Sequence, residues 1–300
     1  MKVKLAIVFI FVNVSFGWSL SGLFKPVEKG ALKESYEVGE IAIRSFSKNI
    51  DEILQYAVER GRISGVDKYK LHTLYSKWNT GGIFLAKCLK VEGCNPYEFY
   101  KKVHNQSPLY KNIYLKYPTL SVEQLRLKVG KVNEIIMDKY FIKSGWKKIE
   151  GEVGRNGIDG LYVKYDKRGN IKDVMLVEAK YGKAQLNRKT NQMSKEWSLK
   201  KIDELIKKYP NNPEYKIIKK RIEQGNYRAR LWKMKEEDGK LVIDLKKIKS
   251  DSSDVVVENL TGGEKTKINY KDNVIIDLNN PKSPFHKEVA NWYKEAIDEI

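Results

Sequence analysis

The sequence predicts a mixed α and β protein, of the α+β or α/β class, in which a helical N-terminal region precedes a sheet flanked by helices. Three observations support this class. Apolar residues recur every three or four positions from about residue 18 to residue 118, a long capped helix follows Ser121, and strand-like runs come next. Because 300 residues exceed the usual size of one domain, we expect two, divided near Lys116-Tyr117-Pro118.

The first residues have the pattern of a secretory signal peptide. Residues 1–4 are cationic, residues 5–14 are nearly all apolar, and Ser15 and Gly17 supply small residues before a cleavage point. The apolar run is shorter than the roughly 20 residues that cross a bilayer. We therefore expect residues 1–17 to be removed and the mature chain to be secreted or periplasmic, with no membrane span.

The helical N-terminal region, residues 18–118, contains no motif for chemistry. Residues 31–47 and 49–61 have helical periodicity, and glycines and prolines interrupt the later pattern. Cys88 and Cys94 close a short loop, and an oxidising compartment permits a disulfide there. No histidine has ligand spacing with this pair, so we interpret it as a local staple rather than a metal site.

The C-terminal region, residues 119–300, begins with a helix and continues into strands. Ser121 and Gln124 form a capping-box pattern, and an apolar stripe continues from Leu125 until Ser144-Gly145 ends it. Strands are predicted over residues 146–153, 158–165 and 174–180, and a helix from near Asn191 to Tyr209. Further strands are predicted over residues 229–234, 241–245, 254–259 and 273–278, and a closing helix begins at Ser283-Pro284.

A hairpin places two carboxylates opposite each other. If its loop is residues 167–170, the register extends back to pair Asp159 with Glu178, with Cβ atoms roughly 5 Å apart. Like charges so placed are destabilising, and a cation would relieve the repulsion. A loop one residue shorter or longer would instead put the two carboxylates on opposite faces of the sheet.

Lys180 completes a set of groups suited to phosphodiester hydrolysis. It lies two residues beyond Glu178 and therefore on the same face of the strand. Two carboxylates can hold Mg²⁺ and leave positions for a phosphate oxygen and a water, which an ammonium group can help to position or deprotonate. The alternative is structural: Asp159 serves a turn, and Glu178 and Lys180 form an exposed salt bridge.

Three motifs together resemble the PD-(D/E)XK nuclease superfamily, whose fold is that of restriction endonucleases. They are Gly157-Ile158-Asp159-Gly160, then Val177-Glu178-Ala179-Lys180-Tyr181-Gly182, and Gln192-Met193-Ser194 with Trp197. The resemblance covers residues 121–209 and is strongest to nuclease domains of bacterial polymorphic and contact-dependent toxins. It implies a restriction-endonuclease-like αβββαβ core with a mixed sheet, the Asp on the second strand and the Glu-x-Lys on the third. Ile158 occupies the position of the family's proline.

The resemblance also implies roles for individual residues. Asp159 and Glu178 would ligate Mg²⁺ or Mn²⁺, and Lys180 would act on the attacking water. Glu134, on the preceding helix one turn after Gly130, and Gln192, on the following helix, would assist. Glu134 as a solvated charge and Gln192 as a partner of its own turn are the alternatives. The loop residues that could bind phosphates, or merely form a solvated connection, are Lys183, Gln185, Arg188 and Lys189.

Composition is consistent with a nucleic-acid partner. Lys plus Arg number 57 against 38 Asp plus Glu, a formal net charge of +19, and the chain contains 18 tyrosines and 6 tryptophans. Such a surface attracts phosphates and stacks bases, although a proteome-wide lysine bias gives the same count.

We expect a secreted Mg²⁺-dependent endonuclease acting on DNA rather than RNA. Its sharper version is a toxin-type enzyme with a cognate inhibitor, or immunity, protein. The private signal peptide departs from this version, because toxin domains of this kind usually lie at the end of large carrier proteins. The alternatives are a non-catalytic extracytoplasmic nucleic-acid-binding or interaction protein that keeps the nuclease fold, and a structural protein whose charge reflects proteome bias.

Overall fold

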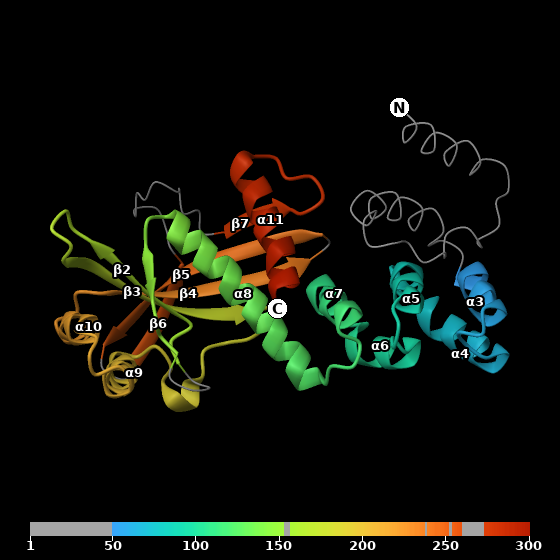
Figure 1. Cartoon of the computed structure of the whole chain (residues 1–300), viewed down its shortest axis with the longest axis horizontal. Helices are drawn as coiled ribbons and strands as arrows, with labels where there is room; N and C mark the ends of the chain where they lie inside the picture. The colour runs from blue at the N-terminus through green and yellow to red at the C-terminus, as the bar shows by residue number, and fades with distance from the viewer. Residues whose placement is uncertain (1–49, 153–156, 238, 252–253, 260–272) are drawn as a thin grey trace. The chain divides into compact units, whose positions relative to one another are not determined.

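The computed structural model describes residues 50–152, 157–237, 239–251, 254–259 and 273–300 (Figure 1). The expected signal peptide and the helix predicted over residues 31–47 lie outside the described residues. The described chain is mixed α and β and divides into two units. The first contains the residues up to Gln106 and Tyr114–Leu120, and the second contains Ser107–Ile113 and Ser121–Ile300. No helix among the described residues is apolar and long enough to cross a membrane.

The first unit is helical, as its periodicity predicts. Its glycine and proline interruptions begin helices: Gly81 is the first residue of α5 and Pro96 the first of α6. Cys88 and Cys94 form a disulfide, with Cα atoms 5.4 Å apart, that links α5 to the segment before α6. The helices that precede the second unit's long helix are α3 (Ile50–Glu59), α4 (Gly65–Tyr75), α5 (Gly81–Lys90), α6 (Pro96–Val103) and α7 (Pro108–Lys116).

The long helix α8 spans Val122–Lys143 and begins as the sequence predicts. The Ser121 hydroxyl accepts a hydrogen bond from the Gln124 N–H, and the Gln124 side chain accepts one from the Ser121 N–H, so the capping box is confirmed. Gly145, with a φ of +80°, follows the helix in the left-handed conformation that favours glycine. The buried apolar stripe of α8 packs on the sheet.

The second unit contains a seven-stranded sheet in its described part, with the order β1-β2-β3-β4-β5-β6 and with β7 paired to β5. Strands β3 and β4 are parallel, and the other pairs are antiparallel. Every strand predicted in this region corresponds to one of the observed strands. These are β1 (Lys147–Ile149), β2 (Gly160–Tyr165), β3 (Ile171–Tyr181), β4 (Arg228–Glu237), β5 (Lys240–Asp251), β6 (Asp254–Asn259) and β7 (Asn273–Asp277).

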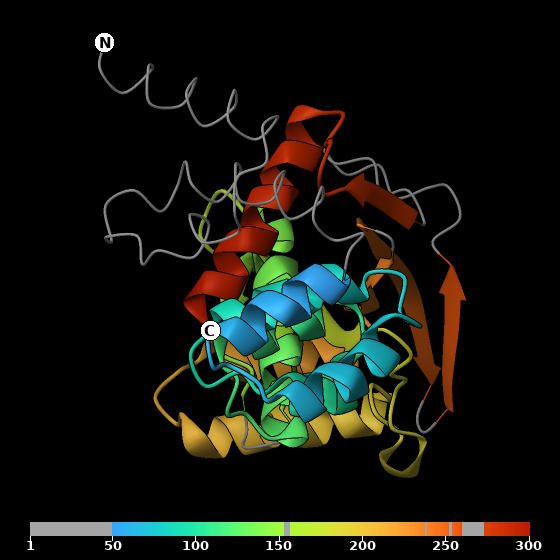
Figure 2. The same ribbon diagram turned by 90° about the vertical axis from the view of Figure 1, so that its right-hand side faces the viewer.

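Helices cover both faces of this sheet. The crossover from β3 to β4 contains α9 (Lys195–Lys208) and α10 (Glu214–Glu223), whose apolar residues share a buried core with Leu161, Leu176 and Leu231. On the opposite face, the ring of Phe141 in α8 lies against Tyr162 and that of Tyr140 against Trp232. Helix α11 (Pro284–Glu299) packs beside α8, and it lies on the opposite side of the unit from α9 and α10 in both views (Figures 1 and 2).

Candidate active site

The register of the β2–β3 hairpin brings Asp159 beside Glu178, although the loop differs from the prediction. Gly160 pairs with Val177 and Leu161 with Leu176, as the sequence predicts. The ladder ends at Gly160, and continued by one residue this register sets Asp159 opposite Glu178, whose pKa the Asp159 charge raises. The predicted four-residue loop is wrong. Asp166 pairs with Asn170, so the loop is one residue shorter, and a shift between Lys164 and Tyr165 restores the register. The extra residue of this bulge lies in β3.

Asp159 lies one residue before β2, where close backbone packing holds it. Its Oδ2 accepts a hydrogen bond of 2.8 Å from the Ala179 N–H, so the carboxylate is tied to the strand that carries Glu178. The Ile158 N–H donates to the Gly151 carbonyl, and a Cβ on Gly151 would come within 2.6 Å of the Ile158 carbonyl oxygen. At Gly160 a Cβ would lie 2.5 Å from the Tyr162 ring. Both glycines therefore permit the approach that positions Asp159.

Glu178 is the central buried group of the site. Its side chain is only 2% exposed, and its Oε1 accepts hydrogen bonds from the Lys180 Nζ at 2.5 Å and from the Gln192 Nε2 at 2.6 Å. Its Oε2 is buried and has no hydrogen-bond partner among the described residues. Burial and then the neighbouring Asp159 raise the pKa of Glu178 to about 8. The alternative of an exposed Glu178–Lys180 salt bridge is therefore wrong.

Gln192 reaches Glu178 from a turn and not from a helix. Helix α9 begins at Lys195 with Ser194 as its N-cap, because Asn191 (φ 46°) and Met193 (φ 71°) have left-handed backbone conformations that a helix cannot include. These two are the non-glycine residues with positive φ in the described chain. The Asn187 N–H donates to Gln192 Oε1, and the Gln192 N–H donates to the Asn187 carbonyl, both at 3.0 Å. This reciprocal pair directs the Gln192 NH₂ toward Glu178.

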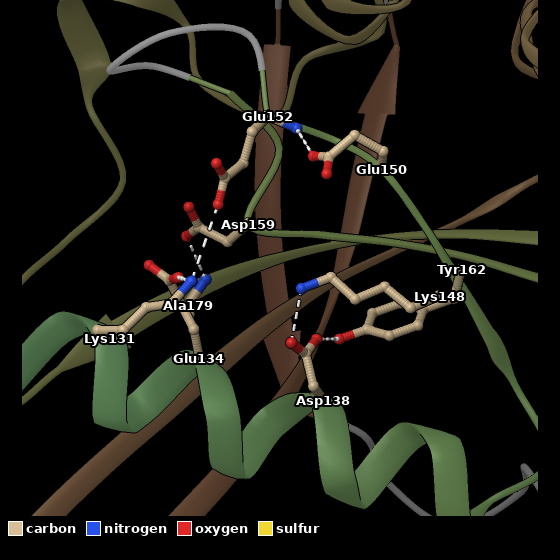
Figure 3. Close-up of polar contacts among 9 residues, drawn as sticks. All are labelled: Lys131, Glu134, Asp138, Lys148, Glu150, Glu152, Asp159, Tyr162 and Ala179. Carbon is tan, nitrogen blue, oxygen red and sulfur yellow. Dashed lines mark hydrogen bonds and ion pairs between the residues drawn. The ribbon is translucent and has the colours of Figure 1, made fainter. Parts of the chain in front are cut away.

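Glu134 lies on α8 beside Asp159, and Figure 3 shows Lys131 and Glu134 extending from the helix toward that carboxylate. Burial, and after it the charge of Asp159, raises the pKa of Glu134. Lys131 Nζ lies 3.4 Å from Glu134 Oε2 and 3.7 Å from Glu152 Oε1. The Glu134 side chain is 26% exposed, so it is half-buried rather than fully solvated.

The hydrogen bonds of Asp138, next to Glu134, were not predicted from the sequence; we call them the brace at Asp138. Asp138, one turn further along α8, accepts hydrogen bonds of 2.5 Å from Lys148 Nζ and from the Tyr162 hydroxyl (Figure 3). These bonds fix α8 to β1 and β2 beside Gly160. The sequence feature that could have indicated this role is the four-residue spacing of Asp138 from Glu134, which places both side chains on one face of the helix. Asn187 had no comparable signal, because its bonds to Gln192 use only its backbone.

The four basic or polar loop residues that follow β3 remain candidates for phosphate contact. All are solvent-exposed, and in the described structure none of their side chains forms a hydrogen bond or ion pair with Asp159 or Glu178. The structure thus brings together Asp159, Glu178, Lys180, Gln192 and Glu134. It leaves Lys183, Gln185, Arg188 and Lys189 at the surface.

The donor set suits a cation that keeps part of its hydration. In the part of the chain that the structure describes, no group of three or more His, Cys, Asp or Glu residues could by itself hold a metal ion. Mg²⁺ is usually bound by one or two carboxylates and several waters, and the unpartnered Oε2 of Glu178 beside Asp159 fits that kind of site. No protein family, curated protein or solved structure matches the chain.

Proposed function

We propose that this chain is a metal-dependent nuclease that hydrolyses phosphodiester bonds. The observation that supports this proposal most strongly is the environment of Glu178. This side chain is buried beside the Asp159 carboxylate; two donors bind one of its oxygens, and no described group binds the other. An ionised carboxylate in such a place is costly unless a cation compensates it. Mg²⁺, with Mn²⁺ as a substitute, fits the charge and the oxygen ligands.

Asp159 and Glu178 would hold the metal, which when bound polarises the phosphodiester and lowers the pKa of water. The Ala179 N–H fixes the Asp159 carboxylate, and Lys180 and Gln192 fix Glu178. Lys180 is 17% exposed, so its ammonium group can keep one N–H on Glu178 and turn another toward the attacking water or a phosphate oxygen.

The order of elements supports the same proposal. Helix α8, strands β1 to β3, helix α9 and strand β4 follow one another as in the PD-(D/E)XK arrangement, with α10 added in the crossover. Glu178 and Lys180 lie in the third of these strands, and Asp159 immediately precedes the second. We extend the proposal to a restriction-endonuclease-like core. The charge of +19 favours nucleic acid as substrate, with DNA first.

Cleavage assays with matched variants test the mechanism. Plasmid DNA and labelled RNA are incubated with the purified protein, and cutting is expected with Mg²⁺ or Mn²⁺ but not with EDTA. Lys180→Met should lose about 10²-fold or more of the activity and keep Mg²⁺ binding by calorimetry, because the carboxylates stay. Glu178→Gln should lose both. Asp203→Asn, which removes one charge from an ion pair with Lys219 between α9 and α10, should lose neither.

Two outcomes would contradict this mechanism. Cutting that survives EDTA excludes the metal, and full activity in Lys180→Met excludes the ammonium group. Salt-dependent binding without cleavage under either cation would instead favour the non-catalytic nucleic-acid-binding protein.

A toxin role and secretion belong to the same proposal. The toxin role is tested in cells. The chain from residue 18 onward, produced in a bacterial cytoplasm, should arrest growth, and Glu178→Gln should relieve the arrest. Equal toxicity of the two forms would separate toxicity from the site. Co-purification with a protein produced from a neighbouring gene would identify the inhibitor that such a toxin requires.

A further inference from the structure

No contact among the described residues requires a glycine at position 130. It lies in the interior of α8, where glycine is less stable than alanine because it loses more backbone freedom on folding. Within the described residues, a Cβ placed on Gly130 would meet no heavy atom within 4 Å, whereas one on Gly151 or Gly160 would clash at 2.6 Å or 2.5 Å. The helix therefore has open space at this position, directly on its backbone.

Gly130 lies between Arg126 and Glu134, four residues from each, so the three residues follow one face of α8. Glu134 is at the candidate site, and Arg126 lies about two turns away from it. Arg126 is exposed and forms no salt bridge within the described part of the chain. Gly130 thus lies between Glu134 at the candidate site and Arg126, whose guanidinium group has no carboxylate partner among the described residues.

Two tyrosines, Tyr110 and Tyr181, lie between Arg126 and the end of β3. The charge of Arg126 acts on Tyr110, where it opposes the burial that raises the pKa of the phenol. The Tyr110 ring lies 6.0 Å from the ring of Tyr181, which directly follows Lys180 in β3. Tyr110, Tyr181 and Arg126 all belong to the second unit. Tyr110 therefore lies between the N-terminal half of α8 and the end of β3.

We propose that Arg126 and Gly130 form the α8 strip, a surface on which the sugar-phosphate backbone of the nucleic acid lies beside the site. Arg126 binds a phosphate through its forked N–H groups, and Gly130 lets the strand approach the helix backbone without meeting a side chain. Tyr110 lines the end of the strip. This inference rests on the proposed nuclease function and assigns its substrate contacts to α8.

The charge contact is tested by binding in EDTA, where no metal-dependent cutting occurs. Fluorescence anisotropy with the full chain and a labelled DNA duplex gives affinity over a series of salt concentrations. Arg126→Ala should weaken binding and reduce the slope of log affinity against log salt by about 0.9, the loss expected for one phosphate contact. Lys128→Ala removes the same charge from the flank of α8 that carries Lys139, the partner of Glu295 in α11. It should leave the slope unchanged.

The approach of the nucleic-acid backbone to α8 is tested by Gly130→Ala. This substitution distinguishes a role of Gly130 in substrate contact from a role in the stability of the helix. Alanine should raise the melting temperature by about 2–4 °C, because it favours the helix, and yet weaken DNA binding several-fold. Gly65→Ala, at the first residue of α4 and also in open space, is the matched control and should leave binding unchanged.

The outcomes distinguish the α8 strip from the nuclease proposal. Equal slopes for Arg126→Ala and Lys128→Ala, or a stabilised Gly130→Ala protein with normal affinity, would overturn the strip even if Mg²⁺-dependent cutting is observed. The expected contrast in binding, together with no cutting under any divalent cation, would support the strip and refute the nuclease.

Discussion

Two buried glutamates of the same sheet, Glu178 and Glu236, have opposite surroundings. Their side chains are 2% and 6% exposed. Glu178 shares its face of the sheet with the core under α9 and α10, and Glu236 lies on the other face, against α11. Glu236 accepts hydrogen bonds from the Tyr293 hydroxyl and the Leu109 N–H, and it faces the buried ammonium of Lys111.

The difference lies in how far the rest of the chain offsets the burial of each carboxylate. Burial raises the pKa of both groups, but three neighbours from the same chain lower that of Glu236. At Glu178 the neighbouring Asp159 raises the pKa further, Lys180 lowers it, and one oxygen has no partner in the described chain. Glu236 thus has partners from the chain and no neighbouring carboxylate among the causes of its pKa shift, whereas Lys180 leaves Glu178 beside a second carboxylate, a repulsion that a proton or a cation would relieve.

The largest expected effect is on stability at Glu236. Glu236→Ala should lower the free energy of unfolding by about 3–5 kcal/mol, because it removes the carboxylate that faces buried Lys111. Glu178→Gln should keep or increase the stability of the metal-free protein, since it removes a repulsion with Asp159. Urea titrations measure both. If Glu236→Ala does not fold, Tyr293→Phe should give a smaller loss, and equal losses at the two glutamates would contradict the comparison.

The next largest expected effect is the pH dependence of stability that Glu178 causes. In the metal-free protein the pKa of Glu178 rises from an ordinary 4.5 to about 8. Between these values the folded protein holds a proton that the unfolded chain releases, so this group's contribution to stability is lost as the pH rises. The decline should be on the order of 1 kcal/mol per pH unit. Urea titrations in EDTA over a series of pH values, carried out on the unchanged protein and on Glu178→Gln, isolate this decline. If the unfolding free energies of the two proteins change in parallel with pH, the raised pKa is contradicted.

Mg²⁺ should reverse this loss. At pH 8 and 100-fold above its dissociation constant, Mg²⁺ should stabilise the protein by about 3 kcal/mol, because only the folded state presents both carboxylates. Thermal unfolding with and without the cation measures the shift. Glu236→Gln should keep this response and Asp159→Asn should lose it. A Mg²⁺ response that survives Asp159→Asn would place the cation elsewhere.

The smallest effect concerns the turn that holds Gln192. Asn191→Gly should change the unfolding free energy by at most about 1 kcal/mol, because glycine accepts the left-handed conformation but adds freedom to the unfolded chain. Cleavage should fall only a few-fold, as the Gln192 amide loses its fixed direction. Asn212→Gly, in the turn between α9 and α10, also adds flexibility, removes the side chain that accepts a hydrogen bond from the Glu214 N–H, and should leave cleavage unchanged.

The sequence predicted the order of elements well because each begins or ends with local chemistry. The capping box at Ser121 and the N-cap at Ser283 use hydrogen bonds within four residues, and the strand pattern follows burial on two faces. Helix α10 was missed, although Tyr215, Ile218 and Ile222 have helical spacing. It is short, and its N-cap residue is Pro213; the side chain that accepts a hydrogen bond from its first N–H is that of Asn212, one residue earlier than the usual capping position.

The site was less predictable because it depends on contacts between distant segments. The register that sets Asp159 opposite Glu178 was predicted from a four-residue loop, and it holds because the bulge in β3 offsets the loop that is one residue shorter. The position of Lys180 beside Glu178 follows from the period of two along β3. The start of α9 was predicted four residues too early, because the left-handed conformations of Asn191 and Met193 carry no glycine signal. The brace at Asp138 depends on how α8 crosses β1 and β2, which local patterns do not specify.

The β3 bulge determines which single-residue changes of chain length this hairpin can tolerate. Removing the extra residue, Lys172, would leave Tyr165 opposite Ile171 and Lys164 opposite Asp173, so the ladder would become regular and Glu178 and Lys180 would keep their face of the sheet. Removing one residue from the regular part of β3, between Val174 and Val177, would instead turn Glu178 and Lys180 to the opposite face. In a related sequence, a single gap at the bulge is therefore compatible with the site, whereas a single gap within the regular part of the strand would mark a lost site.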